Sequence, residues 1–265
     1  MALSPAPRPV LVTRPAGRGA SLLHLLEAQS VPAEHTPLVR LVPAEGEELA
    51  AARDRLADGA HTHLVVTSRT AAEALGAVAV PEGTVVVAVG GGTAEALGAV
   101  GIPATLVAGG SGEALVAQMP EADEGACVLF PASSAASRTV PEGLRAKGYR
   151  VHEVTAYRPE RLEPPPAVAV ALATGGYSAL VLTSPMIARQ AAAVGVHPSI
   201  PIITIGPPTS AAVRAAGLTP AREADETTDE ALAAAVCEVL ALPSAAPGSA
   251  APGGSTPSAG PGPQP

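Results

Sequence analysis

Short apolar runs alternate with longer stretches rich in Ala and Leu over most of the chain. The runs are apolar at consecutive positions, which is typical of strands buried on both faces of a parallel sheet. They predict strands over residues 10–13, 63–68, 84–90, 104–108, 127–132, 149–157, 179–184 and 201–206. The stretches between them predict helices over residues 19–29, 46–58, 70–78, 93–100, 112–119, 139–147, 185–194, 208–216 and 228–240. This alternation indicates an α/β fold with parallel sheets.

Residues with known capping preferences stand at several predicted helix ends. Hydroxyl side chains are expected at N-caps and glycines at C-caps. The expected N-caps are Thr93, Thr209 and Thr228. The expected C-caps are Gly101, Gly148 and Gly217.

The chain also repeats itself. LVVTSRTAAEAL at 64–75 matches LVLTSPMIARQA at 180–191, and VAVGGGTAEALGAVG at 87–101 matches ITIGPPTSAAVRAAG at 203–217, both 116 residues later. Weaker matches link 113–119 with 230–236 and 10–15 with 128–133. The sequence therefore predicts two similar α/β lobes, and a cleft between such lobes is a common place for a ligand site.

The composition narrows the class of protein. The chain has 265 residues, 47% of them hydrophobic, which is enough apolar material for a folded core. Aromatic residues make up only 2% and the net charge is −8, so we expect no nucleic-acid partner. The single lysine, Lys147, lies at a predicted helix end before a glycine. That position argues against a pyridoxal Schiff base and against a lysine-containing phosphate loop.

Other features concern redox state, compartment and chain ends. Cys127 and Cys237 each lie in an apolar run, which predicts buried free thiols rather than a disulfide framework. There is no signal-peptide pattern and no apolar run approaches the ~18 residues of a membrane span, so we expect a cytoplasmic protein. Residues 243–265 contain only Pro, Gly, Ser, Ala, Thr and one Gln, and we expect a disordered tail there.

Several common kinds of site are missing from the pattern. His61 and His63 lack neighbouring Cys or acidic partners in sequence, so no metal site is predicted. No G-x-S-x-G motif occurs, and neither cysteine stands at the carboxyl end of a predicted strand. The turn that begins at Gly90 has Glu95 where the dinucleotide fingerprint needs its third glycine.

Two strand-to-helix turns nevertheless share a polar pattern. Gly90 and Thr93 frame one turn, and Gly206 and Thr209 frame the other. Backbone N–H groups, a hydroxyl and the positive end of a helix at such a turn bind anions. Each lobe also has Thr-Ser at a neighbouring strand end, which adds Ser68 and Ser184 as candidates. Ligands of open α/β sheets bind beyond these carboxyl ends, although each threonine read singly is equally well an N-cap.

Charged and aromatic candidates lie at the same strand ends. Arg14, Arg69 and Arg138 follow three predicted strands, and Ser133 ends one of them. Tyr157 ends an amphipathic strand, where its phenol is either a packed aromatic or a general acid. Taken together, the residues predict a two-lobed α/β protein that binds a polyanionic small molecule. They do not separate an enzyme from a binding protein.

The ordered motifs resemble a known family. The resemblance rests on the series VLVTRP, LVVTS, VAVGGGTAEALGAVGI, L-x-x-K-G-Y-x-V-x-x-V-x-x-Y (144–157), LVLTSP, ITIGPPTSAAVRAAGL and TDEALAAAV, which covers about 10–240. The chain is similar in this order and spacing to the uroporphyrinogen-III synthases. Two departures stand out: Pro185 takes the place that Arg69 has in the other copy, and Gly91-Gly92 replaces a bulkier pair.

The resemblance implies a particular division of the chain. In this family two flavodoxin-like lobes, each a parallel sheet flanked by helices, are joined by a two-stranded antiparallel ladder. Carried onto this sequence, residues 1–36 plus 160–242 form the first lobe and 44–150 the second. The ladder then lies near 37–43 and 151–159.

The resemblance also implies an activity. The family cyclises linear hydroxymethylbilane to uroporphyrinogen III in tetrapyrrole biosynthesis, losing water and inverting ring D, with no metal or organic cofactor. Tyr157 falls on the family's tyrosine, which is often regarded as the acid that assists loss of the hydroxyl. Ser68, Thr93, Ser184 and Thr209 fall on family positions that line the cleft, and Gly90 and Gly206 would keep the turns open for backbone contacts. We expect a monomer that takes over its polycarboxylated substrate from hydroxymethylbilane synthase. The alternative is a non-catalytic ligand-binding or regulatory protein of the same fold.

Overall fold

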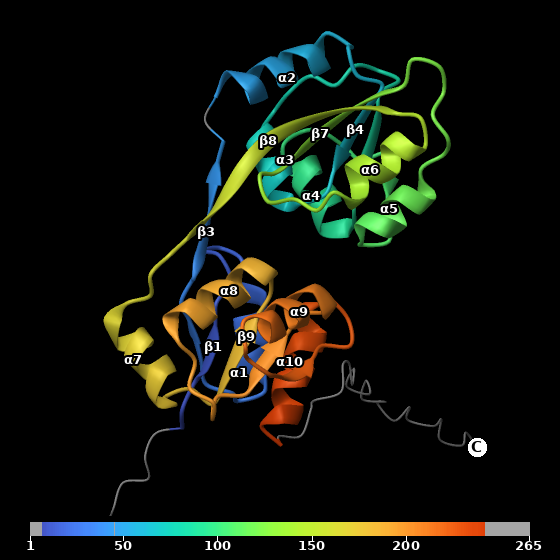
Figure 1. Cartoon of the computed structure of the whole chain (residues 1–265). Helices are drawn as coiled ribbons and strands as arrows, with labels where there is room; N and C mark the ends of the chain where they lie inside the picture. Colours follow the sequence, from blue (N-terminus) through green and yellow to red (C-terminus); the bar gives the residue numbers. More distant parts are fainter. Residues whose placement is uncertain (1–6, 45, 242–265) are drawn as a thin grey trace, which may run out of the picture. The chain divides into compact units, whose positions relative to one another are not determined.

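The computed structural model describes residues 7–44 and 46–241, so the tail expected at 243–265 lies outside the described residues. The described chain forms two compact units (Figure 1). Unit 1 contains residues 7–12, 19–35 and 170–241. Unit 2 contains residues 13–18, 36–44 and 46–169. No helix among these residues is both long enough and apolar enough to cross a membrane.

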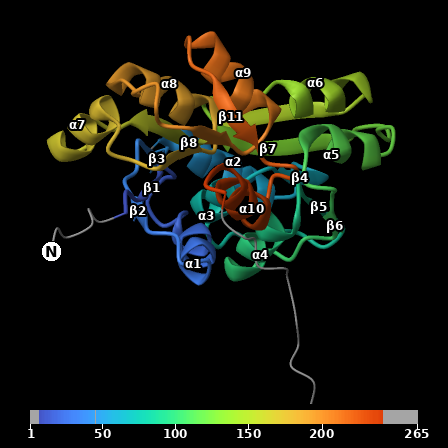
Figure 2. The same cartoon turned by 90° about the horizontal axis from the view of Figure 1, so that it is seen from below.

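Unit 1 is built on a parallel sheet with the strand order β11-β10-β9-β1-β2. Its strands are β1 (Val10–Val12), β2 (Ala33–His35), β9 (Ala179–Leu182), β10 (Ile202–Thr204) and β11 (Pro220–Glu223). Its helices are α1 (Ala20–Ala28), α8 (Pro185–Val194), α9 (Pro207–Ala215) and α10 (Asp229–Val239), and α7 (Pro166–Thr174) enters it from unit 2. Helices α8 and α9 lie together on one face of the sheet, and α1 and α10 on the other (Figure 2). Numbered along the chain, the strand order is 2-1-3-4-5, that of flavodoxin.

Unit 2 is built on a sheet with the order β3-β8-β7-β4-β5-β6. Its strands are β3 (Val39–Pro43), β4 (His63–Val66), β5 (Val85–Ala88), β6 (Leu106–Val107), β7 (Cys127–Ser133) and β8 (Arg150–Arg161). Its helices are α2 (Glu47–Ala57), α3 (Arg69–Leu75), α4 (Gly91–Ala99), α5 (Gly112–Gln118) and α6 (Thr139–Ala146). All strand pairs are parallel except β3 with β8, which is antiparallel.

Alternation along the strands divides the core of unit 2 into two layers. Leu64 and Val66 of β4 pack with the helices α2, α3 and α4 on one face. Val65, between them in sequence, packs with α5 and α6 on the other face. Successive side chains of a strand point to opposite faces, so a strand covered on both sides must be apolar throughout. This is the physical reason for the continuous apolar runs.

The internal repeat becomes a repeat of architecture. In the matched segments, β4 and β5 of unit 2 correspond to β9 and β10 of unit 1, and β7 corresponds to β1. If β8 corresponds to β2 and β6 to β11, the order β8-β7-β4-β5-β6 in unit 2 matches the order β2-β1-β9-β10-β11 in unit 1 strand for strand. In unit 1 the chain enters this arrangement at β1, whereas in unit 2 it enters at β4. The two units are therefore the same fold in a permuted chain order.

The predicted α/β fold with two parallel sheets flanked by helices is confirmed. Each predicted strand and helix overlaps an observed one. The hydrophobic pattern missed β2, β3, β11 and α7, of which only β3 was expected from the family resemblance, near 37–43. The strands β2 and β11 are short, polar edge strands, and α7 is apolar without a one-sided stripe, so neither pattern rule detects them. Cys237 is buried as expected, whereas Cys127 is only half-buried.

The helix caps agree with the sequence only in part. The Thr228 hydroxyl accepts the Ala231 amide at 3.2 Å, as expected of an N-cap. The assignment of Thr93 and Thr209 as N-caps is wrong, because α4 and α9 begin two residues earlier. Gly90 and Gly206 occupy the cap positions, so each threonine is the third residue of its helix.

The glycines expected at the C-caps stand one residue beyond them. Gly101, Gly148 and Gly217 adopt φ values of +82°, +91° and +77°. In each case the next residue returns its amide to a carbonyl of the last turn, as in Leu218 to Val213 at 3.1 Å. This is the Schellman arrangement, which needs a left-handed residue and therefore favours glycine.

The strand β8 changes partner along its length. From Arg150 to Tyr157 it runs parallel to β7, and from Tyr157 to Arg161 it runs antiparallel to β3. An irregularity between Ala132 and Ser133 shifts the register so that Tyr157 lies opposite both Ser133 and Pro43. The domain boundaries expected from the sequence stay a prediction.

Candidate functional site

The candidate residues gather at the carboxyl edges of the two sheets. In unit 2, Ser68 and Gly90 follow the ends of β4 and β5, and Ser133 is the last residue of β7. These three strands are neighbours in the sheet. In unit 1, Ser184 and Gly206 follow the ends of the neighbouring strands β9 and β10. The structure thus brings each set together within its own unit, at the edge where open α/β sheets bind ligands.

The two Thr-Ser strand ends have the same local structure. The hydroxyl of Ser68 accepts the amide of Ala71 at 3.1 Å, and that of Ser184 accepts the amide of Ile187 at 3.2 Å. Both serines are therefore N-caps of the following helices, α3 and α8. A hydroxyl that accepts a cap hydrogen bond still has its own hydrogen to donate. Each serine can thus cap its helix and bind an acceptor on a ligand at the same time.

The hydroxyls of Thr93 and Thr209 do not form N-cap hydrogen bonds to their helices. The two side chains are 6% and 2% exposed. Among the described residues, no hydrogen bond to either hydroxyl is found. Neither hydroxyl oxygen is among the fully buried polar atoms of the described chain that lack a partner, so both can be reached by a ligand and are candidates to donate to one.

The backbone donors of the two turns differ. The sequence pattern predicted free N–H groups at both. In α4, Gly91 and Gly92 are the first two helical residues, whose amides have no acceptor within the helix. In α9 the same positions are Pro207 and Pro208, which have no N–H at all. The prediction for the second turn is therefore wrong at these two positions.

Arg69 strengthens the turn of unit 2. A Cβ placed on Gly92 would lie 3.7 Å from the Cδ of Arg69, so this side chain packs over the start of α4. Among the described residues, no ion pair or hydrogen bond to its guanidinium is found. Two amides, the Thr93 hydroxyl and a guanidinium therefore meet at the positive end of a helix, an arrangement suited to a carboxylate.

Tyr157 lies within the same sheet edge. Its side chain is half-buried and packs against the core layer that contains Leu64 and Val66. Its backbone carbonyl accepts the Ser134 amide at 3.0 Å. In the described part of the chain, its phenol hydroxyl has no hydrogen-bond partner. The ring is thus fixed by packing while the hydroxyl stays available as a donor.

Arg14, Arg138 and Ser133 make contacts within the protein. Arg14 is 9% exposed, and its Nη1 donates to the carbonyl of Arg18 at 3.3 Å. Arg138 is exposed and pairs with Glu153 at 2.7 Å, and hydrogen bonds from this guanidinium to the carboxylate raise the pKa of Arg138. The hydroxyl of Ser133 accepts the Ala135 amide at 3.2 Å. A binding role for these three residues stays a prediction.

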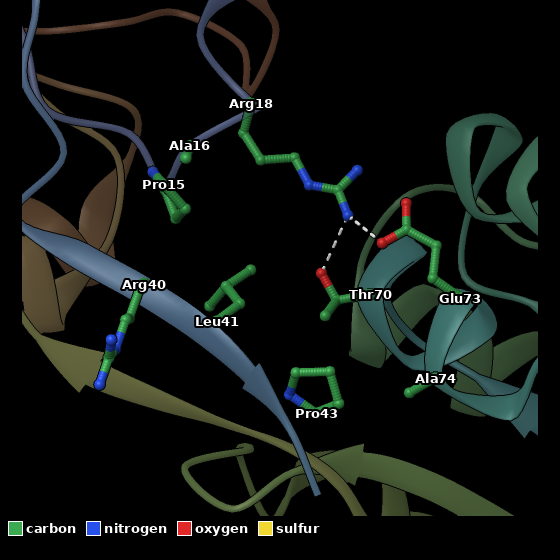
Figure 3. Close-up of a pocket in the computed structure, with 9 residues that line it drawn as sticks. All are labelled: Pro15, Ala16, Arg18, Arg40, Leu41, Pro43, Thr70, Glu73 and Ala74. Carbon is green, nitrogen blue, oxygen red and sulfur yellow. Dashed lines mark hydrogen bonds and ion pairs between the residues drawn. The ribbon is translucent and has the colours of Figure 1, made fainter.

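A pocket in unit 2 adds residues that the sequence patterns missed (Figure 3). Arg18 reaches across it, where its Nη2 donates to Thr70 at 3.1 Å and to the carboxylate of Glu73 at 2.5 Å. The pocket is lined by Pro15, Ala16, Arg18, Arg40, Leu41, Pro43, Thr70, Glu73 and Ala74. It adjoins the candidate site, because Thr70 follows the capping Ser68 by two residues and Pro43 lies opposite Tyr157. No sequence motif predicted these contacts, because they depend on how residues 15–18, 40–43 and 70–74 pack together.

The two histidines weighed as metal ligands lie near the amino end of β4. The ring of His61 stacks on that of His152 with centroids 5.2 Å apart. The Nε2 of His61 lies 3.0 Å from the Nδ1 of His152, whose Nε2 in turn accepts from Arg55 at 2.8 Å. His63 instead packs edge-on against Tyr149. Within the described ranges, no three His, Cys, Asp or Glu side chains are grouped so that they could hold a metal ion.

Comparisons with known proteins place this geometry in context. A family model described as uroporphyrinogen-III synthase HemD matches residues 20–234. A mutant uroporphyrinogen III synthase from the extremely thermophilic bacterium Thermus thermophilus aligns with a TM-score of 0.60 at 17% identity, covering 88% of this chain and 99% of that chain. Uroporphyrinogen-III synthetase from Helicobacter pylori aligns with a TM-score of 0.60 at 17% identity, covering 85% and 96%. No curated protein sequence matches the chain.

Proposed function

Since the chain belongs to the uroporphyrinogen-III synthase HemD family, we propose that it is itself a uroporphyrinogen-III synthase. In this proposal it cyclises hydroxymethylbilane with loss of water and inversion of ring D. The observation that carries the proposal is the phenol of Tyr157, unused within the described residues, at the same sheet edge as the anion-receptive turn of α4. A proton donor beside a turn suited to carboxylates is what loss of the substrate's hydroxyl requires.

The substrate class fits the charge of this edge. The whole chain carries a net charge of −8, so its surface as a whole repels a polycarboxylate. The start of α4 supplies the opposite field, through two amides with no acceptor in the helix, the guanidinium of Arg69 and the helix dipole. We assign substrate carboxylates to this turn. In unit 1 the hydroxyls of Ser184 and Thr209 beside Gly206 take the corresponding role.

Tyr157 is the proposed acid. The first chemical step breaks the carbon–oxygen bond of the hydroxymethyl group, and the departing hydroxyl needs a proton to leave as water. A positioned phenol can donate that proton. Loss of water leaves a cationic azafulvene-type group, which ring D attacks at its substituted carbon. The resulting spiro intermediate then fragments and closes again with ring D inverted.

Positioning supplies the rest of the catalysis. The linear tetrapyrrole also cyclises without a protein, to the uninverted isomer. The protein must therefore hold the two ends of the substrate so that the inverting route is faster. Residues that fix carboxylates at several points serve this purpose, and we add Arg14, Ser133 and Arg138 to that set. The proposal includes a cytoplasmic monomer that receives its substrate from hydroxymethylbilane synthase and uses no cofactor.

An isomer assay tests the proposal. The purified full-length protein is given freshly generated hydroxymethylbilane, and the products are oxidised and separated into type I and type III porphyrins. Protein-free and heat-denatured samples give the background of type I. We expect predominantly type III from the native protein. Type I alone would contradict the proposal and favour a non-catalytic ligand-binding or regulatory protein of this fold.

A further inference from the structure

A buried chain of hydroxyls and a carboxylate lies behind the start of α9. The Oγ of Ser210 donates to the carboxylate of Glu223 at 2.5 Å, and the Oγ1 of Thr204 lies 2.6 Å from the same Ser210 oxygen. Thr204 and Ser210 are fully buried, whereas Glu223 is half-buried. The three residues come from β10, α9 and β11, so the chain of hydrogen bonds ties the first turn of α9 to two strands of the sheet.

The direction of the hydrogen bonds follows from the chemistry of the groups. An ionised carboxylate only accepts, so the single hydrogen of the Ser210 hydroxyl points to Glu223. The Ser210 oxygen then accepts, and Thr204 donates to it. Hydrogen bonds to a charged group are about twice as strong as neutral ones, and a low dielectric strengthens them further. The network therefore holds the start of α9 in one position.

Unit 2 has the same fold without this network. In the repeat, Ala88 is equivalent to Thr204 and Ala94 is equivalent to Ser210. Val107 takes the place of Glu223, because it pairs with Ala88 just as Glu223 pairs with Thr204. Unit 2 therefore forms this corner of the fold with two alanines and an exposed valine, without a polar network. The polar set in unit 1 has a purpose other than forming the architecture.

The adjacent turn suggests that purpose. Ser210 directly follows Thr209, whose hydroxyl has no partner among the described residues and is not one of the fully buried polar atoms. The amides of Thr209 and Ser210 both bond to the Gly206 carbonyl at 3.1 Å. Since Pro207 and Pro208 supply no N–H groups, a ligand at this turn depends on the placement of one hydroxyl. A turn that offers several donors can still bind a ligand after a small displacement, whereas a turn that offers a single hydroxyl loses its contact.

We propose that Ser210 and Glu223 are positioning residues that hold the Gly206–Thr209 turn in the place where Thr209 meets the substrate. This inference rests on the proposed synthase function. Neither residue touches the substrate, and both act through Thr209. Loss of the network leaves the fold intact, as unit 2 demonstrates, but it lets the turn move and the substrate bind less often in the inverting arrangement.

The decisive variant is the triple change Thr204→Ala, Ser210→Ala and Glu223→Val. It installs the residues of unit 2 and leaves no member of the network without a partner. We expect KM to rise about tenfold, kcat to change less, and the share of type I product to rise. Glu223→Gln keeps an acceptor for Ser210 and should preserve most of the activity. Arg222→Gln, which breaks neighbouring ion pairs to Asp225 and Glu238, is the matched control and should leave KM unchanged.

Hydrogen exchange separates this inference from the proposed function. In the ligand-free protein, the first-turn amides of α9 should exchange faster in the triple variant than in the wild type, while those of α4 stay unchanged. Equal exchange in α9 would overturn the inference whether or not the protein is a synthase. An active wild type with an equally active triple variant would overturn it as well. A wild type that forms only type I product would contradict the proposed function and, with it, the role in substrate binding.

Discussion

The starts of α4 and α9 occupy equivalent places in the two units, but they differ in the hydrogen-bond donors that they offer to a ligand. The turn of unit 2 has two glycine amides and a guanidinium beside Thr93. The turn of unit 1 has two prolines and depends on Thr209, with a buried polar network behind it. A duplicated scaffold thus fixes where a ligand site can be. The residues at each turn decide whether the backbone or a side chain supplies the contact.

Removal of the Tyr157 hydroxyl should have the largest effect. We expect Tyr157→Phe to lower kcat about 10²-fold or more, in line with loss of a general acid, with little change in melting temperature. The measurement is steady-state kinetics with separation of isomers. Tyr149→Phe makes the same change at a buried tyrosine of the same unit and should leave kcat unaltered. An unaltered kcat in Tyr157→Phe would remove this residue from the chemistry.

The backbone donors of α4 can be made to resemble those of α9. Gly91→Pro removes one amide at the first helical position, where proline is well accepted and nothing lies within 4 Å of an added Cβ. We expect KM to rise about tenfold with an unchanged or higher melting temperature. Gly91→Ala is the control, because it keeps the N–H group. Equal KM values for the two variants would show that this amide does not bind the substrate.

The two threonines differ from true caps, which gives a third prediction. Neither hydroxyl caps its helix, so Thr93→Ala and Thr209→Ala should each lose less than the ~1 kcal/mol of unfolding free energy typical of a lost N-cap. Their kcat/KM should still fall severalfold. Ser111→Ala, which removes the observed cap of α5, should show the opposite pattern of lower stability and full activity. Denaturant melts and kinetics on all three variants decide the question.

The smallest effect concerns pH and the stacked histidines of unit 2. Burial, then the charges of His152 and Arg55, lower the pKa of His61. Burial and Arg55 also lower the pKa of His152, against a smaller opposite effect of Glu48. Below the unfolded-state pKa of about 6.5, the unfolded chain therefore binds more protons than the folded one.

Stability should consequently be complete above about pH 6.5 and fall as the pH drops toward the lowered folded pKa values. Melting temperatures measured from pH 8 to pH 5 test this dependence. His152→Gln can still accept from Arg55 but does not titrate, so its curve should be flatter than that of the wild type. A curve equally steep in this variant would assign the acid sensitivity to other groups.

The sequence predicted the sheets well because their physics is local. Consecutive apolar residues in β4, β5, β7 and β9 report burial on both faces, whichever strand lies beside them. The edge strands β2 and β11 lack that burial, and the pattern missed them. The predicted helix start was off by two residues at α4 and by one at α9. The threonine there is a good cap by preference, but extended backbone at Gly90 and Gly206 moves the cap upstream.

The sequence predicted where the candidate site residues lie, but it did not predict which of them form hydrogen bonds within the protein. The sequence singled out Ser68, Thr93 and Tyr157 because they follow apolar runs. It could not tell that Ser68 caps a helix while the other two have hydroxyls without a partner in the described part of the chain, since that depends on which amides lie within reach. Nor could it find the contact of Arg18 with Glu73, or the chain from Thr204 to Glu223.

By itself, the sequence determined the α/β class, the duplication and the strand ends at which the candidate residues lie. These follow from burial patterns and from repetition, which act through neighbours along the chain. Only the tertiary structure decided which strands pair, how the second copy is permuted, and which polar groups are used up within the protein. Those outcomes depend on contacts between residues far apart in sequence, where a shift of one hydrogen bond separates a structural hydroxyl from one that can meet a substrate.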